Sequence, residues 1–352
     1  MHDPEFNTPV QWDVQLLDGF PWKEVTNRGN GGLGFFGLFN PGLWSLVREG
    51  NFDAVVCFTG YLRASFWIAF LACKFSRSAF IFGTDTFTVA AKDRRFWKPR
   101  VKQFFWPCLY RLADQTIVGS SRGVELMRSL GIPPDRISLI PNAVDNEWWI
   151  SQASCVDRQA VRSSWGANPE TSVALFCAKL QTWKRPLDLL RAFARANVPN
   201  SLLVVAGEGP LRREMEREVA HLGVSTRVRF LGFVNQTQLP GIYTAADLMV
   251  LPSEYDAFGL VVNEANCCGC PAVVSDMVGA AQDLVAPVDP TLIYPCGDVA
   301  ALTEILRKLL ASPERLRQLG AAALKCVSHW SHNQSVSATL EAVRAAVSRR
   351  DS

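Results

Sequence analysis

The sequence has no long hydrophobic run and almost no excess charge, and each absence excludes a class of protein. Its apolar stretch at residues 64–73 is about half of the ~20 residues that cross a bilayer, so it predicts a buried helix. The N-terminal residues are polar and acidic, and we therefore expect no signal peptide. The formal net charge is only +3, which argues against nucleic acid as the main partner.

Spacings typical of metal sites are also missing. The four histidines are His2, His221, His329 and His332, and none forms an HxxxH pair. Zinc on Cys267, Cys268 and Cys270 would need a fourth ligand and usually a second cluster, which the sequence does not offer. We interpret these cysteines as small apolar residues at the end of a helix that Gly269 caps, and we expect no metal. Without a signal peptide, the ten cysteines favour reduced thiols and a cytoplasmic location.

Short apolar runs alternate with amphipathic segments along the whole chain. Strands that are apolar throughout and separated by helices predict parallel sheets covered on both faces, the doubly wound α/β class. The expected strands are 54–58, 79–83, 115–119 and 137–141 in the first half, and 172–178, 201–207, 228–234, 247–253, 271–276 and 291–295 in the second. The length of 352 residues favours two domains.

The expected domains are an N-terminal one at 1–148 and a C-terminal one at 149–330, followed by a helix at 331–352 that could pack back on the first. The polar segment 142–168 is the expected linker. Two helical stripes stand out, and the first ends at Gly223. The stripes consist of Leu211, Met215, Val219 and Leu222, and of Val336, Leu340, Val343 and Val347.

A glycine-rich run at 29–34 fits GxGxxG, but it does not follow a buried strand. That fingerprint binds phosphate only at a turn from strand to helix, so we interpret the run as a flexible turn. The segment EYDAFGLVVNEA (254–265) has the right context, because it joins a predicted strand to a helix expected from about Phe258 to Cys268. The N–H groups of Phe258, Gly259 and Leu260 would face an anion there, and Gly259 allows close backbone approach.

Asp256 and Glu264 lie in the same segment, roughly 12 Å apart along a helix. They are too far apart to share a proton, but they could grip hydroxyls at two places on an extended ligand. Two further strand ends carry possible ligand groups. Lys179 and Lys184 could neutralise a diphosphate, although basic loops are commonly solvated. Segment 205–210, VAGEGP, is again a strand that runs into a Gly-rich turn.

The segments AKLQTWK, GEGP, FLGFV, LPSEYDAFGLVVNEA and GCPAVV occur in this order between about 170 and 330. They resemble the nucleotide-binding domain of the retaining glycosyltransferases of family 4, and the resemblance continues more faintly over 118–146. It implies the GT-B fold, with two Rossmann-like domains that face a cleft. It also implies transfer of a sugar from a UDP- or GDP-linked donor to a hydroxyl of a glycan, a lipid-linked or a small-molecule acceptor, with retention and without a metal or other cofactor.

The resemblance also implies roles for single residues. Lys184 would hold the donor diphosphate, with Lys179 standing where the family usually has arginine. Glu264 would bind the ribose hydroxyls, and Asp256, in place of a usual glutamate, would contact the sugar hydroxyls. The remaining donor-site positions would supply backbone N–H groups, shape the cleft or lie near the base. They are Phe258, Gly259, Leu260, Gly207, Gly209 and Phe233.

The first half departs from the family pattern. The strand and Gly-rich acceptor loop that begin the family's N-terminal domain are missing, so we expect that domain to be incomplete. No histidine stands between His2 and His221, where the family commonly places one near the donor sugar. Asp85 is our third catalytic candidate, beside Lys184 and Asp256, although a turn or helix-capping aspartate fits it equally well. A non-catalytic or truncated nucleotide-sugar-binding protein therefore remains an alternative. An epimerase would need a cluster of acids and histidines that we do not find.

Segment 92–107, KDRRFWKPRVKQFFWP, mixes cationic and aromatic residues. Such a mixture can lie at an anionic membrane surface, which would give peripheral contact with the inner face of the membrane. An ordinary amphipathic helix with its aromatic residues in the core is the alternative that we favour.

Overall fold

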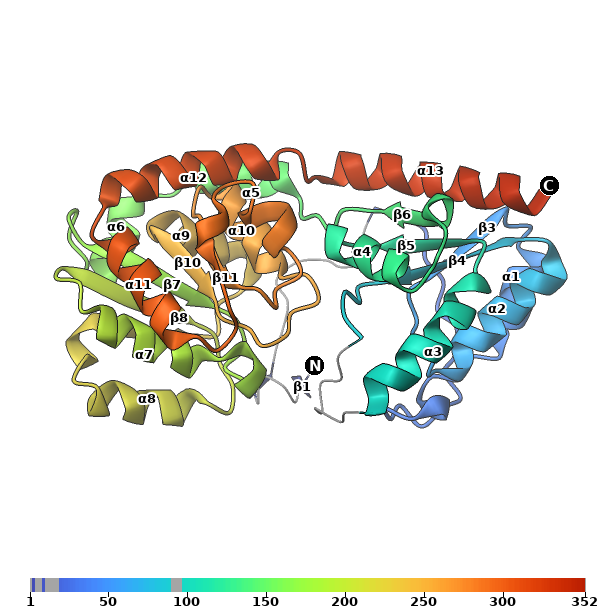
Figure 1. Cartoon of the computed structure of the whole chain (residues 1–352), viewed down its shortest axis with the longest axis horizontal. Coiled ribbons are helices and arrows are strands. Elements are labelled where there is room, and N and C mark those ends of the chain that lie inside the picture. Colours follow the sequence, from blue (N-terminus) through green and yellow to red (C-terminus); the bar gives the residue numbers. More distant parts are fainter. Residues whose placement is uncertain (1, 4–7, 10–18, 90–96, 352) are drawn as a thin grey trace. The chain divides into compact units, whose positions relative to one another are not determined.

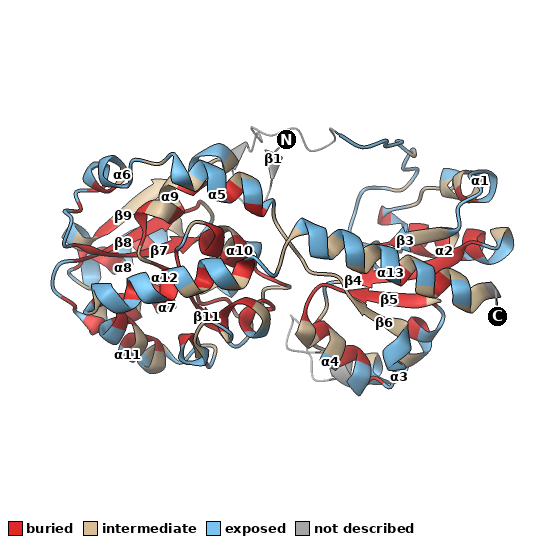
Figure 2. Cartoon of the chain, turned by 90° about the horizontal axis from the view of Figure 1, so that it is seen from above, coloured by how far each residue is buried: buried red, intermediate tan, exposed pale blue. Residues whose placement is uncertain are grey.

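The computed structural model describes residues 2–3, 8–9, 19–89 and 97–351 and forms two units (Figure 1). Unit 1 comprises Met1–Leu16 and Asn142–His332, and unit 2 comprises Leu17–Pro141 and Asn333–Ser352. Each unit holds a parallel sheet covered by helices, which confirms the predicted α/β class. Figure 2 shows that the inner strands of both sheets are buried and that the strands at 54–57, 137–139 and 228–232 are mostly intermediate, while the helices expose their outer faces.

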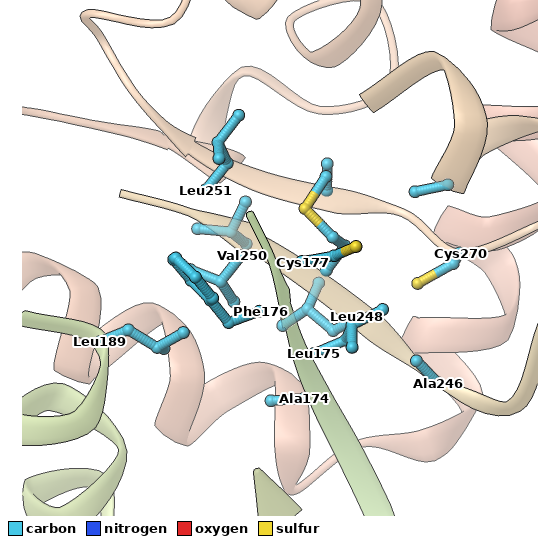
Figure 3. Packing of buried hydrophobic residues seen from close by; sticks show 14 of the residues in the cluster. Ala174, Leu175, Phe176, Cys177, Leu189, Ala246, Leu248, Val250, Leu251 and Cys270 are labelled. Carbon is cyan, nitrogen blue, oxygen red and sulfur yellow. The ribbon is translucent and has the colours of Figure 1, made fainter. Parts of the chain in front are cut away.

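The sheet of unit 1 has six parallel strands in the order β12-β11-β10-β7-β8-β9, and each coincides with a predicted run. Strands β7, β8, β10 and β11 are buried along their whole length. Figure 3 shows Leu175 and Phe176 of β7 packed with Leu248 and Val250 of β10. The strands are β7 (Ser172–Cys177), β8 (Ser201–Ala206), β9 (Val228–Gly232), β10 (Leu248–Leu251), β11 (Ala272–Ser275) and β12 (Ile293–Tyr294).

Helices of seven to fifteen residues cover most of this sheet, with shorter turns between them. The predicted stripe of Met215 and Val219 is buried on α8, and Gly223 follows the helix at a φ of +68°. The helices are α5 (Asn146–Ser154), α6 (Arg158–Ser164), α7 (Pro186–Ala196), α8 (Arg212–His221), α9 (Leu239–Ala245), α10 (Leu260–Cys267), α11 (Val299–Leu310) and α12 (Pro313–Val327). The short turns are η3 (Thr182–Lys184), η4 (Ser225–Arg227), η5 (Gln236–Gln238), η6 (Ala281–Val285) and η7 (Pro290–Leu292).

The prediction of a polar linker over 142–168 is wrong, because helices α5 and α6 occupy most of that segment. Trp149 and Trp165 are buried in the core of unit 1. The ring of Trp149 lies 5.8 Å from that of Tyr243 on α9. Two large aromatic side chains bury enough apolar surface to fix a segment that is otherwise mostly polar.

Unit 2 has four parallel strands in the order β3-β4-β5-β6, all of them predicted. The apolar run at 64–73 lies in α2, as expected, and buries Phe66, Ala72 and Cys73. The elements are β3 (Ala54–Cys57), β4 (Ala79–Thr84), β5 (Gln115–Val118), β6 (Ile137–Leu139), α1 (Gly42–Glu49), α2 (Ala64–Ser76), α3 (Trp97–Arg111), α4 (Ser121–Ser129), α13 (His332–Asp351), η1 (Phe35–Gly37) and η2 (Pro134–Arg136). Two short strands, β1 (His2–Asp3) and β2 (Thr8–Pro9), pair with each other.

Helix α13, red in Figure 1, packs on the sheet of unit 2, and of the predicted stripe Val343 and Val347 contact that core while Val336 and Leu340 do not. Val336 and Leu340 are 59% and 51% exposed. The buried residues are Ala342 and Ala346, which contact β4 and β5 and allow the helix to approach closely. At its end, Arg349 donates hydrogen bonds to the Asp114 carbonyl (2.6 Å) and to Gln115 Oε1 (2.8 Å).

The glycine-rich run at 29–34 is a loop, as predicted, and no strand precedes it within 19–28. Arg63 holds it by donating from Nη1 to the carbonyls of Gly32 (2.7 Å) and Gly34 (2.8 Å). Across the described ranges, no helix has both the length and the apolar character to cross a membrane.

Candidate functional site

The loops that follow β7 and β10 meet at one edge of the unit 1 sheet. These strands are parallel neighbours, so their carboxyl ends lie side by side. Lys184 Nζ lies 2.5 Å from Asp256 Oδ2, and the two side chains are only 18% and 15% exposed. The structure thus joins two predicted site residues that stand 72 positions apart in the chain.

Backbone contacts fix these loops to each other. The Glu254 N–H donates to the Trp183 carbonyl at 2.6 Å. Arg185 follows η3 in the left-handed region, at a φ of +50°, and donates from Nε to Asp188 Oδ2 at 2.6 Å. Lys184 therefore reaches Asp256 from a turn whose neighbouring residues, Trp183 and Arg185, are both held by hydrogen bonds.

The loop after β8 lies against the loop after β7, and two predicted glycines allow that approach. Gly207 and Gly209 have φ values of +148° and +152°, which favour glycine. A Cβ on Gly207 would lie 2.0 Å from the Ala178 carbonyl oxygen, and one on Gly209 would lie 2.6 Å from that of Leu180. These glycines thus support the loop that carries Lys179, which is half-buried just beyond β7.

Helix α10 begins at Leu260, two residues later than predicted. Gly259 has a φ of +95°, and this left-handed residue delays the helix. Within the described ranges, no protein oxygen accepts from the backbone N–H groups of Phe258, Gly259 and Leu260. Their contact with an anion stays a prediction. The Phe258 side chain itself is buried and stacks on Trp330, with ring centroids 5.8 Å apart.

Glu264 lies on α10 and accepts a 2.8 Å hydrogen bond from the hydroxyl of Tyr243 at Oε2. The Tyr243 oxygen is also 3.3 Å from Cys177 Sγ at the end of β7. Burial raises the pKa of Glu264 to about 7, and the bond from Tyr243 opposes part of that rise. Burial also raises the pKa of Cys177 to about 12, so its thiol stays neutral.

Sequence reasoning missed Tyr243 and Cys177 as neighbours of Glu264. A tyrosine within an apolar helix is a usable signal, because a buried hydroxyl almost always finds a partner. Nothing in the spacing indicates which partner, since Tyr243 and Glu264 lie on different helices.

We expect unit 1 to lose stability relative to a Glu264→Gln variant as pH rises from about 5 to about 8. The folded pKa of Glu264, about 7, exceeds its ordinary value of 4.5. The favourable contribution of the protonated carboxyl is therefore complete below pH 4.5 and is lost as pH rises through 7. Thermal unfolding of both proteins without nucleotide, across that range, measures the difference. Parallel curves for the two proteins would contradict the raised pKa.

Phe233 and Asp85 are the last two predicted site residues, and the roles predicted for them stay predictions. Phe233 follows β9 and is half-buried, directly after Gly232 at a φ of +76°. Asp85 belongs to unit 2, where it is exposed just beyond β4. Its place in the reaction remains a prediction.

The cysteines of the 267–270 run are packed in the interior. Cys267 and Cys270 are buried, and burial raises the pKa of Cys267 to about 12. Gly269 stands just after α10 at a φ of +70°, which confirms the predicted cap. In the part of the chain that the structure describes, no three His, Cys, Asp or Glu residues gather as a metal site would require.

Comparisons with known proteins cover both units. The family described as "Glycosyl transferases group 1" matches residues 157–325, and "Glycosyltransferase Family 4" matches residues 13–148. A D-inositol 3-phosphate glycosyltransferase of Catenulispora acidiphila is 32% identical over 243 residues, which is 65% of this chain and 55% of that protein. The 2-deoxystreptamine N-acetyl-D-glucosaminyltransferase of Streptomyces fradiae is 30% identical over 238 residues, or 68% and 49%. The chain thus spans about half the length of the curated relatives that it matches.

Solved structures share the fold. Anabaena HepE, solved with UDP and glucose, has a TM-score of 0.67 at 20% identity and covers 90% of this chain, which covers 85% of HepE. The lipopolysaccharide outer core galactosyltransferase WaaB has a TM-score of 0.66 at 19% identity, with coverages of 86% and 78%. These likenesses confirm the predicted GT-B class. With matches to both family descriptions, the chain belongs to the family 4 glycosyltransferases, the glycosyl transferases of group 1.

Proposed function

We propose that the chain transfers a sugar, with retention, from a nucleotide diphosphate sugar to an acceptor hydroxyl. The observation that carries this proposal is the Lys184–Asp256 pair, which stands directly before the open N–H groups at the start of α10. A cation, a carboxylate and free backbone donors in one place suit a ligand that has both phosphates and hydroxyls.

The diphosphate would exchange partners with the ion pair. Lys184 would turn from Asp256 to the phosphate oxygens, together with Lys179 and the N–H groups of Gly259 and Leu260. The negative charge that develops on the leaving diphosphate is then stabilised by lysines and a helix N-terminus, an arrangement that needs no metal ion. Addition of EDTA should therefore leave turnover unchanged.

Release from Lys184 leaves the Asp256 carboxylate free to accept hydrogen bonds from the donor sugar. Glu264 would do the same for the ribose hydroxyls, with its free lone pairs, while Tyr243 holds Oε2. A carboxylate accepts two hydroxyls better than a carboxylic acid does. Binding should thus favour ionised Glu264.

Names of related proteins support the donor class. HepE was solved in complexes with UDP and with UDP-glucose. The named relatives act on D-inositol 3-phosphate and on 2-deoxystreptamine, which are small hydroxyl-bearing acceptors. We therefore propose a UDP-linked donor first and a GDP-linked donor second, with a glycan, lipid-linked or small-molecule acceptor.

The test is a screen of the purified chain with UDP-, GDP- and ADP-sugars. Thermal shift reports binding, and free nucleoside diphosphate reports turnover. We expect one donor class to raise the melting temperature and to be cleaved when an acceptor is present. Glu264→Ala should lose both signals. The matched control is Glu216→Ala, which removes a half-exposed carboxylate paired with Arg212 on α8.

Three outcomes would contradict parts of this proposal. No binding of any donor by folded protein would exclude the donor site. Binding without release, across a panel of acceptors, would favour the alternative of a non-catalytic nucleotide-sugar-binding protein. A product whose anomeric configuration by NMR is opposite to that of the donor would exclude retention.

A further inference from the structure

Helix α3, teal in Figure 1, is apolar on two faces, and the core explains only one of them. Trp106, Leu109 and Tyr110 are buried in unit 2. On the other side, Val101 is 54% exposed and Phe104 is 85% exposed. The outward-facing residues recur at the spacing of a helix face. They are Arg100, Val101, Gln103, Phe104, Phe105, Cys108 and Arg111, with Leu112 directly after the helix.

Further exposed apolar side chains neighbour, in sequence, residues that contact this helix or are held by Arg63. The ring of Phe105 lies 5.8 Å from that of Tyr61, whose hydroxyl accepts from Trp106 Nε1 at 2.9 Å. The next residue, Leu62, is 65% exposed. Arg63 then binds the carbonyls on either side of Leu33, which is 92% exposed. We call this set the α3 surface, and it consists of Leu33, Leu62, Val101, Phe104 and Phe105.

The charge on this helix has one sign. Residues 97–111 include Lys98, Arg100, Lys102 and Arg111, and they contain no aspartate or glutamate. Arg100 and Arg111 share the exposed face with the apolar stripe. Lys102 lies over the ring of Trp106, 4.9 Å from its centroid.

We propose that the α3 surface docks on an anionic lipid bilayer. Aromatic and aliphatic side chains would enter the boundary between headgroups and acyl chains, while the cations meet lipid phosphates. A second copy of this chain fits less well, because a two-fold contact would bring cations against cations. This inference goes beyond the proposed function and does not rest on it. The sequence alternative with all aromatic residues in the core is right for Trp106 and wrong for Phe104 and Phe105.

Vesicle co-sedimentation of the full chain tests this surface. The probe is phosphatidylcholine vesicles with about one third phosphatidylglycerol, compared with pure phosphatidylcholine. We expect the full chain to pellet with the anionic vesicles and to dissociate as salt rises from about 0.05 M to about 0.3 M. Val101→Ser/Phe104→Ser should weaken partitioning at least tenfold, and Arg100→Glu should weaken it several-fold. Both variants change exposed side chains, so they should unfold at the temperature of the unsubstituted protein.

The matched control is Val336→Ser/Leu340→Ser, which removes two comparably exposed apolar side chains from α13 in the same unit. It should partition like the unsubstituted protein. The proposal is overturned if the chain does not bind anionic vesicles, if it binds neutral vesicles equally well, or if both double variants behave alike. It is also overturned if gel filtration shows a dimer that only Val101→Ser/Phe104→Ser dissociates.

Discussion

Lys184→Ala should lower kcat/KM for the nucleotide-sugar donor by about 10²–10³-fold, the scale expected when one preorganised charge is removed from a developing anion. The substitution also leaves Asp256 without its partner at 2.5 Å, so an unneutralised carboxylate would stand beside the position proposed for the phosphates. The affinity for free nucleoside diphosphate should fall as well. Steady-state kinetics and calorimetric titration with the donor class found by the screen measure the two effects.

Two further variants separate the effect of losing the Lys184 cation from the effect of exposing the Asp256 carboxylate. Lys184→Ala/Asp256→Asn should recover diphosphate binding relative to Lys184→Ala, because the repulsive carboxylate is gone, yet turnover should stay low. Asp256→Asn alone should bind diphosphate at least as tightly as the unsubstituted protein. In this variant Lys184 has no ion pair to break before it contacts the phosphates. Equal diphosphate affinity in all four proteins would show that Lys184 does not contact the phosphates.

Gly207→Ala should destabilise unit 1 by about 3 to 5 kcal/mol, through backbone strain and overlap together. The new Cβ would lie 2.0 Å from the Ala178 carbonyl oxygen at a φ of +148°. The backbone at Gly207 cannot shift away from Ala178 without cost, because the Gly207 N–H donates to the Gly232 carbonyl at 2.7 Å. Thermal or urea unfolding, followed by tryptophan fluorescence, should show a drop in melting temperature of about 6 °C or more.

Gly223→Ala is the matched control for this substitution. Gly223 has a φ of +68°, but a Cβ there would meet no atom within 4 Å. The free energy of unfolding of Gly223→Ala should therefore fall only by the intrinsic cost of a left-handed backbone, roughly 1–2 kcal/mol. If the two variants lose equal stability, the close approach between the loops after β7 and β8 does not contribute to the fold.

The sequence predicted every strand of the two larger sheets, because fully buried parallel strands are continuous apolar runs. It also predicted a set of donor-site residues, two of which, Lys184 and Asp256, form an ion pair in the structure, but it did not predict how they meet. The contact of Lys184 with Asp256 depends on β7 and β10 being neighbours, and sheet order is not written in local spacing. The start of α10 was misplaced because the left-handed backbone of Gly259 is set by its surroundings.

Two other differences follow from packing. Only Val343 and Val347 of the stripe predicted for α13 pack on the sheet of unit 2, where the smaller Ala342 and Ala346 are the buried residues of the helix. Segment 142–168 was predicted to be a linker from its polarity, yet Trp149 and Trp165 anchor it. In both cases a few buried side chains determine how the segment packs, and the overall hydrophobic or polar pattern of the segment does not predict them.

The position of α13 also determines the order in which the protein can be completed during translation. Residues Leu17–Pro141 of unit 2 are made before Asn142–His332 of unit 1, but α13, which also belongs to unit 2, follows that whole segment. The face of Ala79, Ile81 and Ile117 that α13 covers is therefore left bare while unit 1 is being made. At about 5–20 residues per second, that interval lasts on the order of ten seconds or more. Unit 1 can thus finish folding before unit 2, and the nascent sheet of unit 2 is exposed to chaperones until α13 has emerged from the ribosome.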